Sequence, residues 1–249
     1  MAGPPVRWMP LESNPEVMNK YISLLGVPTS WQFTDVFGLD PELLCMIPQP
    51  CCALILLFPI TQDYYEAFKD EPKQEVSEKL FFMKQTIRNA CGTIGVIHAV
   101  ANAREKIGID ETSVIGKFLA DCGKLDSSDK GKRLETDVSI QNLHKQCASE
   151  GQTAALAAES KVDLHFVALV QVDGCLYEFD GCKPTPVNHG SSSEETFVMD
   201  AARVCREFMA KNKNELRFTI VALKIYFVIS AKCLRKVFVS IKGYYFQAV

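Results

Sequence analysis

Apolar residues recur at helical spacing near the start of the chain, which predicts an amphipathic helix there. Its apolar face is formed by Val17, Tyr21, Leu24 and Leu25. Asn14 before Pro15 is typical of an N-cap followed by proline at the first helical position. Gly26 then supplies a residue that tolerates the backbone conformation at a helix end. The sequence therefore predicts a helix that begins at Pro15 and ends at Gly26.

Strand-like runs and further helical patterns alternate along the rest of the chain. The sequence predicts strands at residues 31–37, 51–58 and 217–223 and helices at residues 41–46 and 114–122. A capping box of Ser192 and Glu195 predicts one more helix. Its apolar face is formed by Phe197, Ala201, Val204 and Phe208.

One of these strands indicates how the sheet is covered. Residues 51–58 are apolar on both faces, which is typical of a central strand in a sheet with two covered faces. Residues 61–79 are rich in charge and are interpreted as a solvated loop with some helix. Helices packed on an antiparallel or mixed sheet indicate an α+β domain.

A hairpin is predicted where Asp173-Gly174 separates two β-rich runs. That turn sets a register in which Val167 lies opposite Asp180. His165 then lies on the same face, as a diagonal neighbour of Asp180 at roughly 7–8 Å between backbones, so their side chains can meet. An aspartate that holds a histidine in one tautomer is the orienting half of a catalytic triad. The alternative is a buried histidine whose hydrogen bond is satisfied by an acid.

Cys91 lies near the start of another predicted helix, because the residues after it have helical spacing and Asn89 is a plausible N-cap. The positive end of a helix favours the thiolate, which is the nucleophile of cysteine hydrolases. Gln85 carries an N–H donor that can stabilise an oxyanion together with the Cys91 backbone N–H. The alternative is that Cys91 is a small buried hydrophobic residue.

Composition indicates a folded chain that contains reduced thiols. The 249 residues are 47% hydrophobic, enough for one large or two small domains. The N-terminus has no apolar signal segment, and the longest apolar run, near residues 51–60, is too short to span a bilayer. Ten cysteines occur without a CxxC or a Cys/His zinc spacing. We therefore expect a cytoplasmic monomer with free thiols and no membrane or nucleic-acid partner.

Nucleophile, base, orienting acid and oxyanion donor are thus present in one chain. The segments that contain them, KQTIRNACGT at 84–93, VDLHF at 162–166 and LYEFDG at 176–181, resemble the ubiquitin carboxyl-terminal hydrolases. EGQT at 150–153, RWMPLE at 7–12 and WQFTDV at 31–36 match as well. The resemblance runs from about Arg7 to Leu223 and is greatest to the short, single-domain members.

The resemblance implies a papain-like, knotted α+β fold with a central, mostly antiparallel sheet flanked by helices. It implies a thiol hydrolase that removes small adducts from the C-terminal glycine of ubiquitin or a ubiquitin-like modifier. Cys91 would be the nucleophile and His165 the general base and then the general acid. Asp180 would orient His165, and Gln85 would donate to the oxyanion. The resemblance implies no metal and no organic cofactor.

The resemblance also predicts how substrate is received. Residues 143–160 would form a crossover loop above the active site, with Glu150, Gly151, Gln152 and Thr153 as its matching positions; an ordinary surface connection is the alternative. The basic C-terminal strand of ubiquitin would contact a surface formed by Pro10, Leu11, Glu12, Asp35, Glu215, Leu216 and Phe218. For each single acid of that set, ordinary solvated surface charge is the alternative.

The chain departs from the family after Leu223. Residues 224–249 contain five basic residues, no acid and two strand-like runs, at 225–229 and 237–241. We therefore predict a catalytic domain at residues 1–223 and an atypical tail at 224–249, either docked on the domain or poorly ordered. The net charge of −3 for the whole chain leaves the domain acidic, which suits a basic partner. A ubiquitin-binding protein that stabilises ubiquitin with little turnover is the alternative function.

Overall fold

The computed structural model describes residues 6–60, 64, 76–152, 162–211 and 215–226. Its strands are β1 (Trp31–Asp35), β2 (Cys51–Pro59), β3 (Leu164–Val172), β4 (Cys175–Phe179), β5 (Val187–Ser191) and β6 (Thr219–Ile225). Its helices are α1 (Pro15–Leu25), α2 (Pro41–Leu44), α4 (Cys91–Asn102), α5 (Arg104–Ile107), α6 (Val114–Cys122), α7 (Ser127–Glu135), α8 (Val138–Ala148) and α9 (Phe197–Lys211). Among these residues, no helix is long and apolar enough to cross a membrane.

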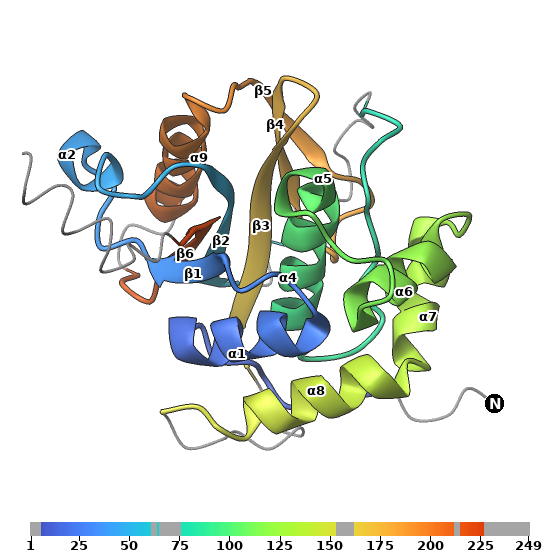
Figure 1. Ribbon diagram of the computed structural model, residues 1–249. Helices are drawn as coiled ribbons and strands as arrows, with labels where there is room; N and C mark the ends of the chain where they lie inside the picture. The colour runs from blue at the N-terminus through green and yellow to red at the C-terminus, as the bar shows by residue number, and fades with distance from the viewer. Residues whose placement is uncertain (1–5, 61–63, 65–75, 153–161, 212–214, 227–249) are drawn as a thin grey trace, which may run out of the picture.

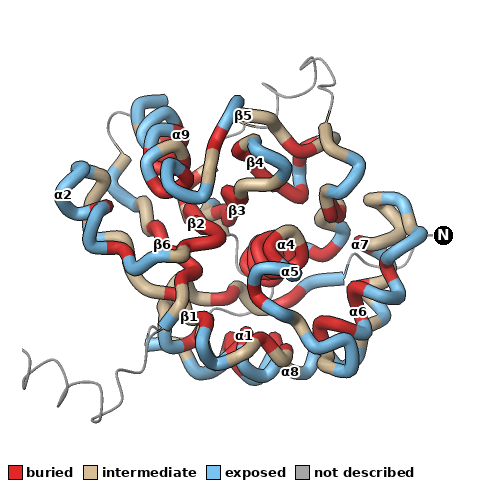
Figure 2. The backbone as a smooth tube through the Cα atoms, turned by 45° about the horizontal axis from the view of Figure 1, so that its top comes forward, coloured by how far each residue is buried: buried red, intermediate tan, exposed pale blue. Residues whose placement is uncertain are grey.

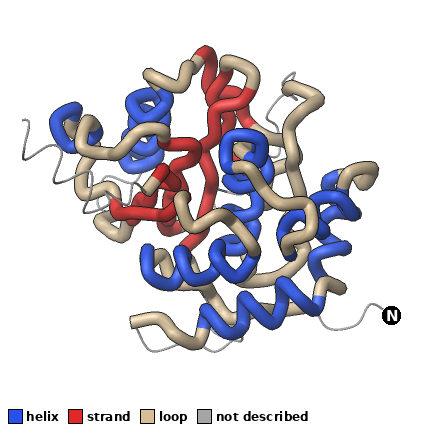
Figure 3. The backbone as a smooth tube through the Cα atoms, in the orientation of Figure 1, coloured by secondary structure: helices blue, strands red, loops and turns tan. Residues whose placement is uncertain are grey.

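The strands form a six-stranded sheet in the order β1-β6-β2-β3-β4-β5, and all five neighbouring pairs are antiparallel. Figure 3 shows the strands, in red, running through the molecule between helices. The predicted α+β class with a central antiparallel sheet is therefore confirmed. β2 lies inside the sheet, and all of its residues except the half-buried Leu57 are buried. Its apolar residues face both ways because helices cover both faces of the sheet.

Two hydrophobic cores lie on opposite sides of the sheet. The larger core includes buried residues of α1, α4, α6 and α8, and α4 packs directly on β3 (Figure 1). The smaller core joins α2 and α9 to the other face, where the predicted apolar residues of α9 are all buried. Figure 2 shows α4 as an almost continuously buried tube in the middle of the molecule. The first residue of α4 is Cys91, so the most enclosed helix carries the predicted nucleophile at its end.

The β3–β4 hairpin has the predicted register. Asp173 and Gly174 both have left-handed φ angles, 49° and 78°, as a two-residue turn of the Asp-Gly kind requires. Val172 pairs with Cys175 at one end of the ladder, and Ala168 pairs with Phe179 at the other. Continued by one residue, this register places Val167 opposite Asp180, as predicted.

The first helix also agrees with its prediction. The Asn14 side chain accepts a hydrogen bond from the Glu16 N–H at 2.8 Å, and Gly26 ends α1 with φ of 95°. The predicted helix at residues 114–122 is α6, and the predicted strand at 51–58 is β2 with one more residue.

Two predicted helix starts are wrong in detail. Asn89 is not an N-cap of α4, because it has a left-handed φ of 63° and its side-chain amide donates to the Trp8 carbonyl at 3.2 Å. The Ser192–Glu195 capping box does not form either. Ser192 donates to Asp200 at 2.8 Å, whereas Glu195 accepts from the next serine, Ser193, at 2.7 Å.

Several strands and helices end at other residues than predicted. The strand predicted at 31–37 ends at Asp35, and the helix predicted at 41–46 ends at Leu44. The final strand begins at Thr219 and continues to Ile225, because Lys224 and Ile225 still pair with β1. The predicted domain boundary after residue 223 therefore falls inside β6. Residues 227–249, with the second strand-like run, and residues 61–63 and 65–75 lie outside the described residues.

Candidate active site

Cys91 is half-buried at the first position of α4, where it lines a cavity of about 530 Å³ together with His165 and Gln85. Every residue from Gly92 to Ala101 is buried, so the helix is held firmly behind the thiol. Gly92 is needed for this packing, because a Cβ there would lie 2.9 Å from Leu11 Cβ. The sequence thus places a thiol at the end of a fixed helix, where the free N–H groups favour an anion.

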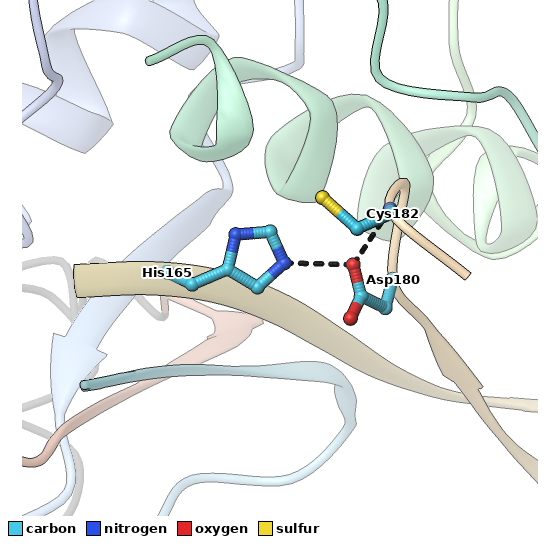
Figure 4. A group of neighbouring side chains, drawn as sticks. All are labelled: His165, Asp180 and Cys182. Carbon is cyan, nitrogen blue, oxygen red and sulfur yellow. Dashed lines mark hydrogen bonds and ion pairs between the residues drawn. The ribbon is translucent and has the colours of Figure 1, made fainter. Parts of the chain in front are cut away.

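The hairpin brings His165 and Asp180 into contact, as predicted (Figure 4). His165 Nε2 donates to Asp180 Oδ1 at 2.7 Å, and both side chains are almost fully buried. The carboxylate has two further donors. The Cys182 backbone N–H lies 2.8 Å from Oδ1, and the Tyr64 hydroxyl lies 2.7 Å from Oδ2. Asp180 is therefore fixed in orientation and fixes the imidazole in turn.

Electrostatics keep this buried pair charged. Burial lowers the pKa of His165, but the Asp180 carboxylate and hydrogen bonds with the side chains of Cys182 and Cys91 raise it well above its ordinary value. Burial raises the pKa of Asp180, but the charge and hydrogen bond of His165 lower it further, to about 2. Cys91 and His165 line the same cavity, which brings the predicted nucleophile and the predicted base to one site. Because Nε2 is bonded to Asp180, Nδ1 is the ring nitrogen left for the thiol.

Gln85 is held against the other side of the site. Its backbone N–H donates to the Gly181 carbonyl at 2.8 Å, and its side chain lines the cavity that contains Cys91. Gly181 approaches so closely that a Cβ there would meet Gln85 atoms at 3.0 to 3.1 Å. The Gln85 Oε1 atom is buried without a hydrogen-bond partner among the described residues. A buried amide oxygen without a partner is uncommon, and it distinguishes Gln85 from an ordinary buried polar side chain.

The sequence did not predict two groups that support Asp180. Glu178 is 1% exposed and binds Lys183 Nζ at 2.8 Å and His189 Nε2 at 2.9 Å. Lys183 also donates its backbone N–H to the Asp180 carbonyl at 3.0 Å, so this buried cluster anchors the turn that contains Asp180. An acid between Tyr177 and Phe179 in an apolar strand was the available signal. Tyr64 left no comparable signal, since its charged surroundings indicated a solvated loop.

The predicted ubiquitin contacts fall into two groups. Pro10, Leu11 and Glu12 line the same cavity as Cys91, and His144 Nε2 fixes the residue before them by donating to the Met9 carbonyl at 2.7 Å. The remaining predicted contacts do not line that cavity. They are Asp35 at the end of β1, Glu215 in contact with Arg217, Leu216 with 91% exposure, and Phe218 packed against the smaller core.

The predicted crossover segment is partly helical. Its first residues, 143–148, belong to α8, because Asp137 caps that helix and Cys147 and Ala148 are buried in the larger core. After α8, Glu150 forms an ion pair with Lys20, and Gly151 packs against the Glu12 carboxylate, which would have to shift to admit a Cβ. Gln152 is exposed, and Thr153 and residues 154–160 lie outside the described residues. The described part of this segment therefore lies beside one wall of the cavity.

Comparison with known proteins agrees with this geometry. The family model described as "Ubiquitin carboxyl-terminal hydrolase, family 1" matches residues 8–210. Ubiquitin carboxyl-terminal hydrolase isozyme L1 of Homo sapiens is 49% identical over 218 residues, which cover 86% of this chain and 96% of that protein. The protein of the same name from Monodelphis domestica is 44% identical over the same shares.

Solved structures share the fold at low sequence identity. The catalytic domain of Trichinella spiralis UCH37, crystallised with ubiquitin vinyl methyl ester, superposes with a TM-score of 0.72 at 22% identity. The match covers 88% of this chain and 96% of that one.

Proposed function

Because this chain belongs to family 1 of the ubiquitin carboxyl-terminal hydrolases, which makes it a cysteine-type deubiquitinating hydrolase, we propose that Cys91, His165, Asp180 and Gln85 carry its reaction. The observation that supports this assignment most is the 2.7 Å contact of His165 with Asp180 beside the thiol that begins α4. Nucleophile and base thus line one cavity, and the orienting acid contacts the base behind it.

Acylation follows from this arrangement. The proton of the Cys91 thiol resides on His165 Nδ1 in the reactive ion pair, and the Cys91 sulfur attacks the carbonyl carbon of the terminal glycine of ubiquitin. The Cys91 backbone N–H and the Gln85 amide stabilise the oxyanion that forms. His165 then returns its proton to the leaving group, and an acyl-enzyme remains. A water molecule, deprotonated by His165, hydrolyses the thioester and frees both ubiquitin and the thiol.

Substrate recognition begins at the cavity wall. Pro10, Leu11 and Glu12 form this wall, so they are placed to contact the last residues of ubiquitin as these approach Cys91. Glu12 supplies negative charge where a basic strand would enter. Glu215, Leu216, Phe218 and Asp35 would contact ubiquitin farther from the thiol. The ubiquitin derivative bound to the Trichinella spiralis protein supports ubiquitin as the partner.

The alternative, a protein that holds ubiquitin with little turnover, required that the tail or a misaligned His165 block the site. The 2.7 Å contact of His165 with Asp180 argues against a misaligned His165.

Hydrolysis of ubiquitin that carries a fluorogenic C-terminal amide tests the proposal. We expect turnover by the intact chain and by the matched control Cys45→Ala, which alters an exposed thiol at the end of α2 that does not line the cavity. We expect no turnover by Cys91→Ala. Equal rates for Cys91→Ala and the intact chain would overturn the assignment of the nucleophile.

We also propose a reducing compartment, the cytoplasm, as the location of the protein. All nine cysteines of the described residues are free thiols, and such thiols persist where glutathione keeps them reduced. Cell fractionation checks this location, and recovery of the protein only from an oxidising compartment would contradict it.

A further inference from the structure

Cys182 stands beside the catalytic pair but takes no part in the reaction described above. It follows Asp180 by two residues, and the backbone N–H of Cys182 donates to the Asp180 carboxylate. Its side chain is exposed, whereas His165 and Asp180 are buried. An exposed sulfur is thus located next to a buried imidazole and a buried carboxylate.

The three side chains converge closely enough to share one ion. One potential ligand atom from each of His165, Asp180 and Cys182 lies within 4.8 Å of the other two. In Figure 4 the Cys182 sulfur lies toward the imidazole, above the His165–Asp180 hydrogen bond. Among the residues that the structure describes, this is the one group of three His, Cys, Asp or Glu side chains that meets this criterion.

We propose that His165, Asp180 and Cys182 form a Zn²⁺ site whose occupation switches the hydrolase off. The inhibitory part of this inference rests on the proposed function; the binding of the metal does not. The site would be regulatory, since the reaction itself needs no metal.

The donor set selects the metal. Thiolate sulfur, imidazole nitrogen and carboxylate oxygen are the ligands that Zn²⁺ takes in proteins, with water as a fourth ligand. Mg²⁺ and Ca²⁺ prefer oxygen ligands and would gain little from Cys182. Zinc–ligand bonds of about 2.0–2.3 Å place tetrahedral ligand atoms roughly 3.3–3.5 Å apart. The exposed Cys182 side chain therefore has to move inward, and the His165–Asp180 contact has to open slightly.

The surroundings would support such an ion. The Tyr64 hydroxyl on Asp180 Oδ2 leaves Oδ1 directed toward His165, as an outer hydrogen bond does for a metal-bound carboxylate. The exposed thiol offers the ion a path from solvent to the two buried ligands.

Binding would remove what the reaction requires. The Nε2 proton of His165 would leave for solvent, so that the Nε2 lone pair bonds to zinc while Nδ1 keeps its own proton. The Cys182 thiol would lose its proton to solvent and bind as thiolate. Asp180 would then hold the metal and could no longer accept from His165. His165, fixed on the ion, could not exchange a proton between Cys91 and the leaving group.

Zinc inhibition of hydrolysis gives the first test. The full chain, Cys182→Ser and Cys45→Ser are each titrated with ZnCl₂ on the fluorogenic ubiquitin amide, and each rate is compared with its own zinc-free rate. Serine keeps the size and hydrogen bonding of Cys182 but is a poor zinc ligand. We expect the zinc concentration for half-inhibition to rise about 100-fold in Cys182→Ser, because loss of an interaction that supports a bound metal lowers the metal affinity by about this factor. Cys45→Ser should match the original chain, and a chelator should restore activity.

Equal zinc sensitivity of Cys182→Ser and the original chain would overturn the proposal, because zinc would then act on Cys91 alone. A second measurement does not depend on hydrolysis. Co²⁺ is added to Cys91→Ser, and thiolate-to-cobalt absorption is recorded together with the stoichiometry from equilibrium dialysis. We expect one bound ion with a thiolate band, and loss of that band in Cys91→Ser/Cys182→Ser. The site would be refuted if the thiolate band were absent from Cys91→Ser or unchanged in Cys91→Ser/Cys182→Ser. This outcome is independent of whether the chain hydrolyses ubiquitin derivatives.

Discussion

Asp180 connects more of the site than any other described side chain. Its carboxylate accepts from His165, from the Cys182 backbone and from Tyr64, and each contact is 2.7 or 2.8 Å. Three donors to one buried carboxylate stabilise its charged form, which agrees with the lowered pKa of Asp180. The negative charge then stabilises the imidazolium that the reaction forms.

Asp180→Asn tests that role at the residue scale. The amide keeps the shape of the carboxylate but removes the charge beside His165, so the imidazolium loses its partner. We expect kcat to fall by about 10²–10⁴-fold, the range for loss of a positioned acid or base. Steady-state kinetics on the fluorogenic ubiquitin amide measure the effect. A kcat within threefold of the original chain's would show that His165 works without this charge.

The sequence predicted the His165–Asp180 contact because a two-residue turn leaves little freedom of register. Once Asp173-Gly174 was assigned, the pairing of every later residue of the hairpin followed. Tyr64 could not be found in the same way. Its contact with Asp180 joins residues far apart in the sequence and depends on tertiary packing that no local pattern records.

At the scale of elements, the buried Glu178 joins β4 to the turn after it and to β5. Glu178 neutralises Lys183, which is itself buried, and contacts His189. Burial raises the pKa of Glu178, but its bonds with His189 and Lys183 lower it further, so the acid stays ionised. The charge of Lys183 is therefore compensated inside the protein.

Glu178→Gln removes that compensation. Because Lys183 would remain buried without its ionic partner, we expect the free energy of unfolding to fall by about 3 kcal/mol. Urea unfolding at neutral pH measures the change. Glu207→Gln is the matched control, since its ion pair with Arg203 is exposed and should change stability by less than about 1 kcal/mol. Equal effects of the two substitutions would contradict a structural role for the buried cluster.

Element ends show where local patterns were insufficient. Asn89 has the side chain of an N-cap, but its contact with the Trp8 carbonyl ties it to the N-terminal segment. Ala90 therefore precedes α4 without a side-chain cap. The N-terminus of α4 is defined by tertiary contacts, which the spacing of apolar residues cannot reveal.

At the scale of the whole molecule, the sequence patterns did not predict the order of the strands in the sheet. β6 comes from the far end of the described chain and lies between β1 and β2. Apolar strands predicted that both faces of the sheet would be covered, but they carried no information about which strands are neighbours. The family resemblance predicted a central, mostly antiparallel sheet, but it did not predict the order of the strands.

Acid should destabilise the whole fold through two buried histidines. Burial lowers the pKa of His144 to about 4 and that of His98 to about 3, from an ordinary value of 6.5. As pH falls, both histidines bind protons in the unfolded chain at a higher pH than in the folded protein. Their neutral forms therefore stabilise the fold fully above pH 6.5, and this contribution is lost in the window between pH 6.5 and about 4. His165 acts in the opposite direction at the top of the window, because its raised pKa adds stability as pH falls through 6.5. That gain is complete in the lower part of the window, where the loss from His98 and His144 continues.

Urea unfolding between pH 7.5 and pH 4 checks this dependence, with about 1 kcal/mol or more expected to be lost across the window. His144→Gln should flatten the profile, because it removes one of the two titrating groups. A stability that stayed constant down to pH 4 would contradict neutral buried histidines.

Truncation tests where the catalytic domain ends. Removal of residues 227–249 should leave hydrolysis and stability intact, since all pairs of β6 remain. Removal of residues 224–249 also deletes Lys224 and Ile225, which pair with β1, and should lower the urea midpoint. Loss of hydrolysis in the shorter truncation would show that the tail belongs to the catalytic unit.

The most direct test of the central claim identifies the sulfur that attacks ubiquitin. Ubiquitin with a thiol-reactive group at its C-terminus is incubated with the full chain, and the adduct is mapped by peptide mass spectrometry. The account predicts one adduct, on Cys91, that does not form in Cys91→Ala. An adduct on another of the ten cysteines, or equal labelling of Cys91→Ala, would contradict it.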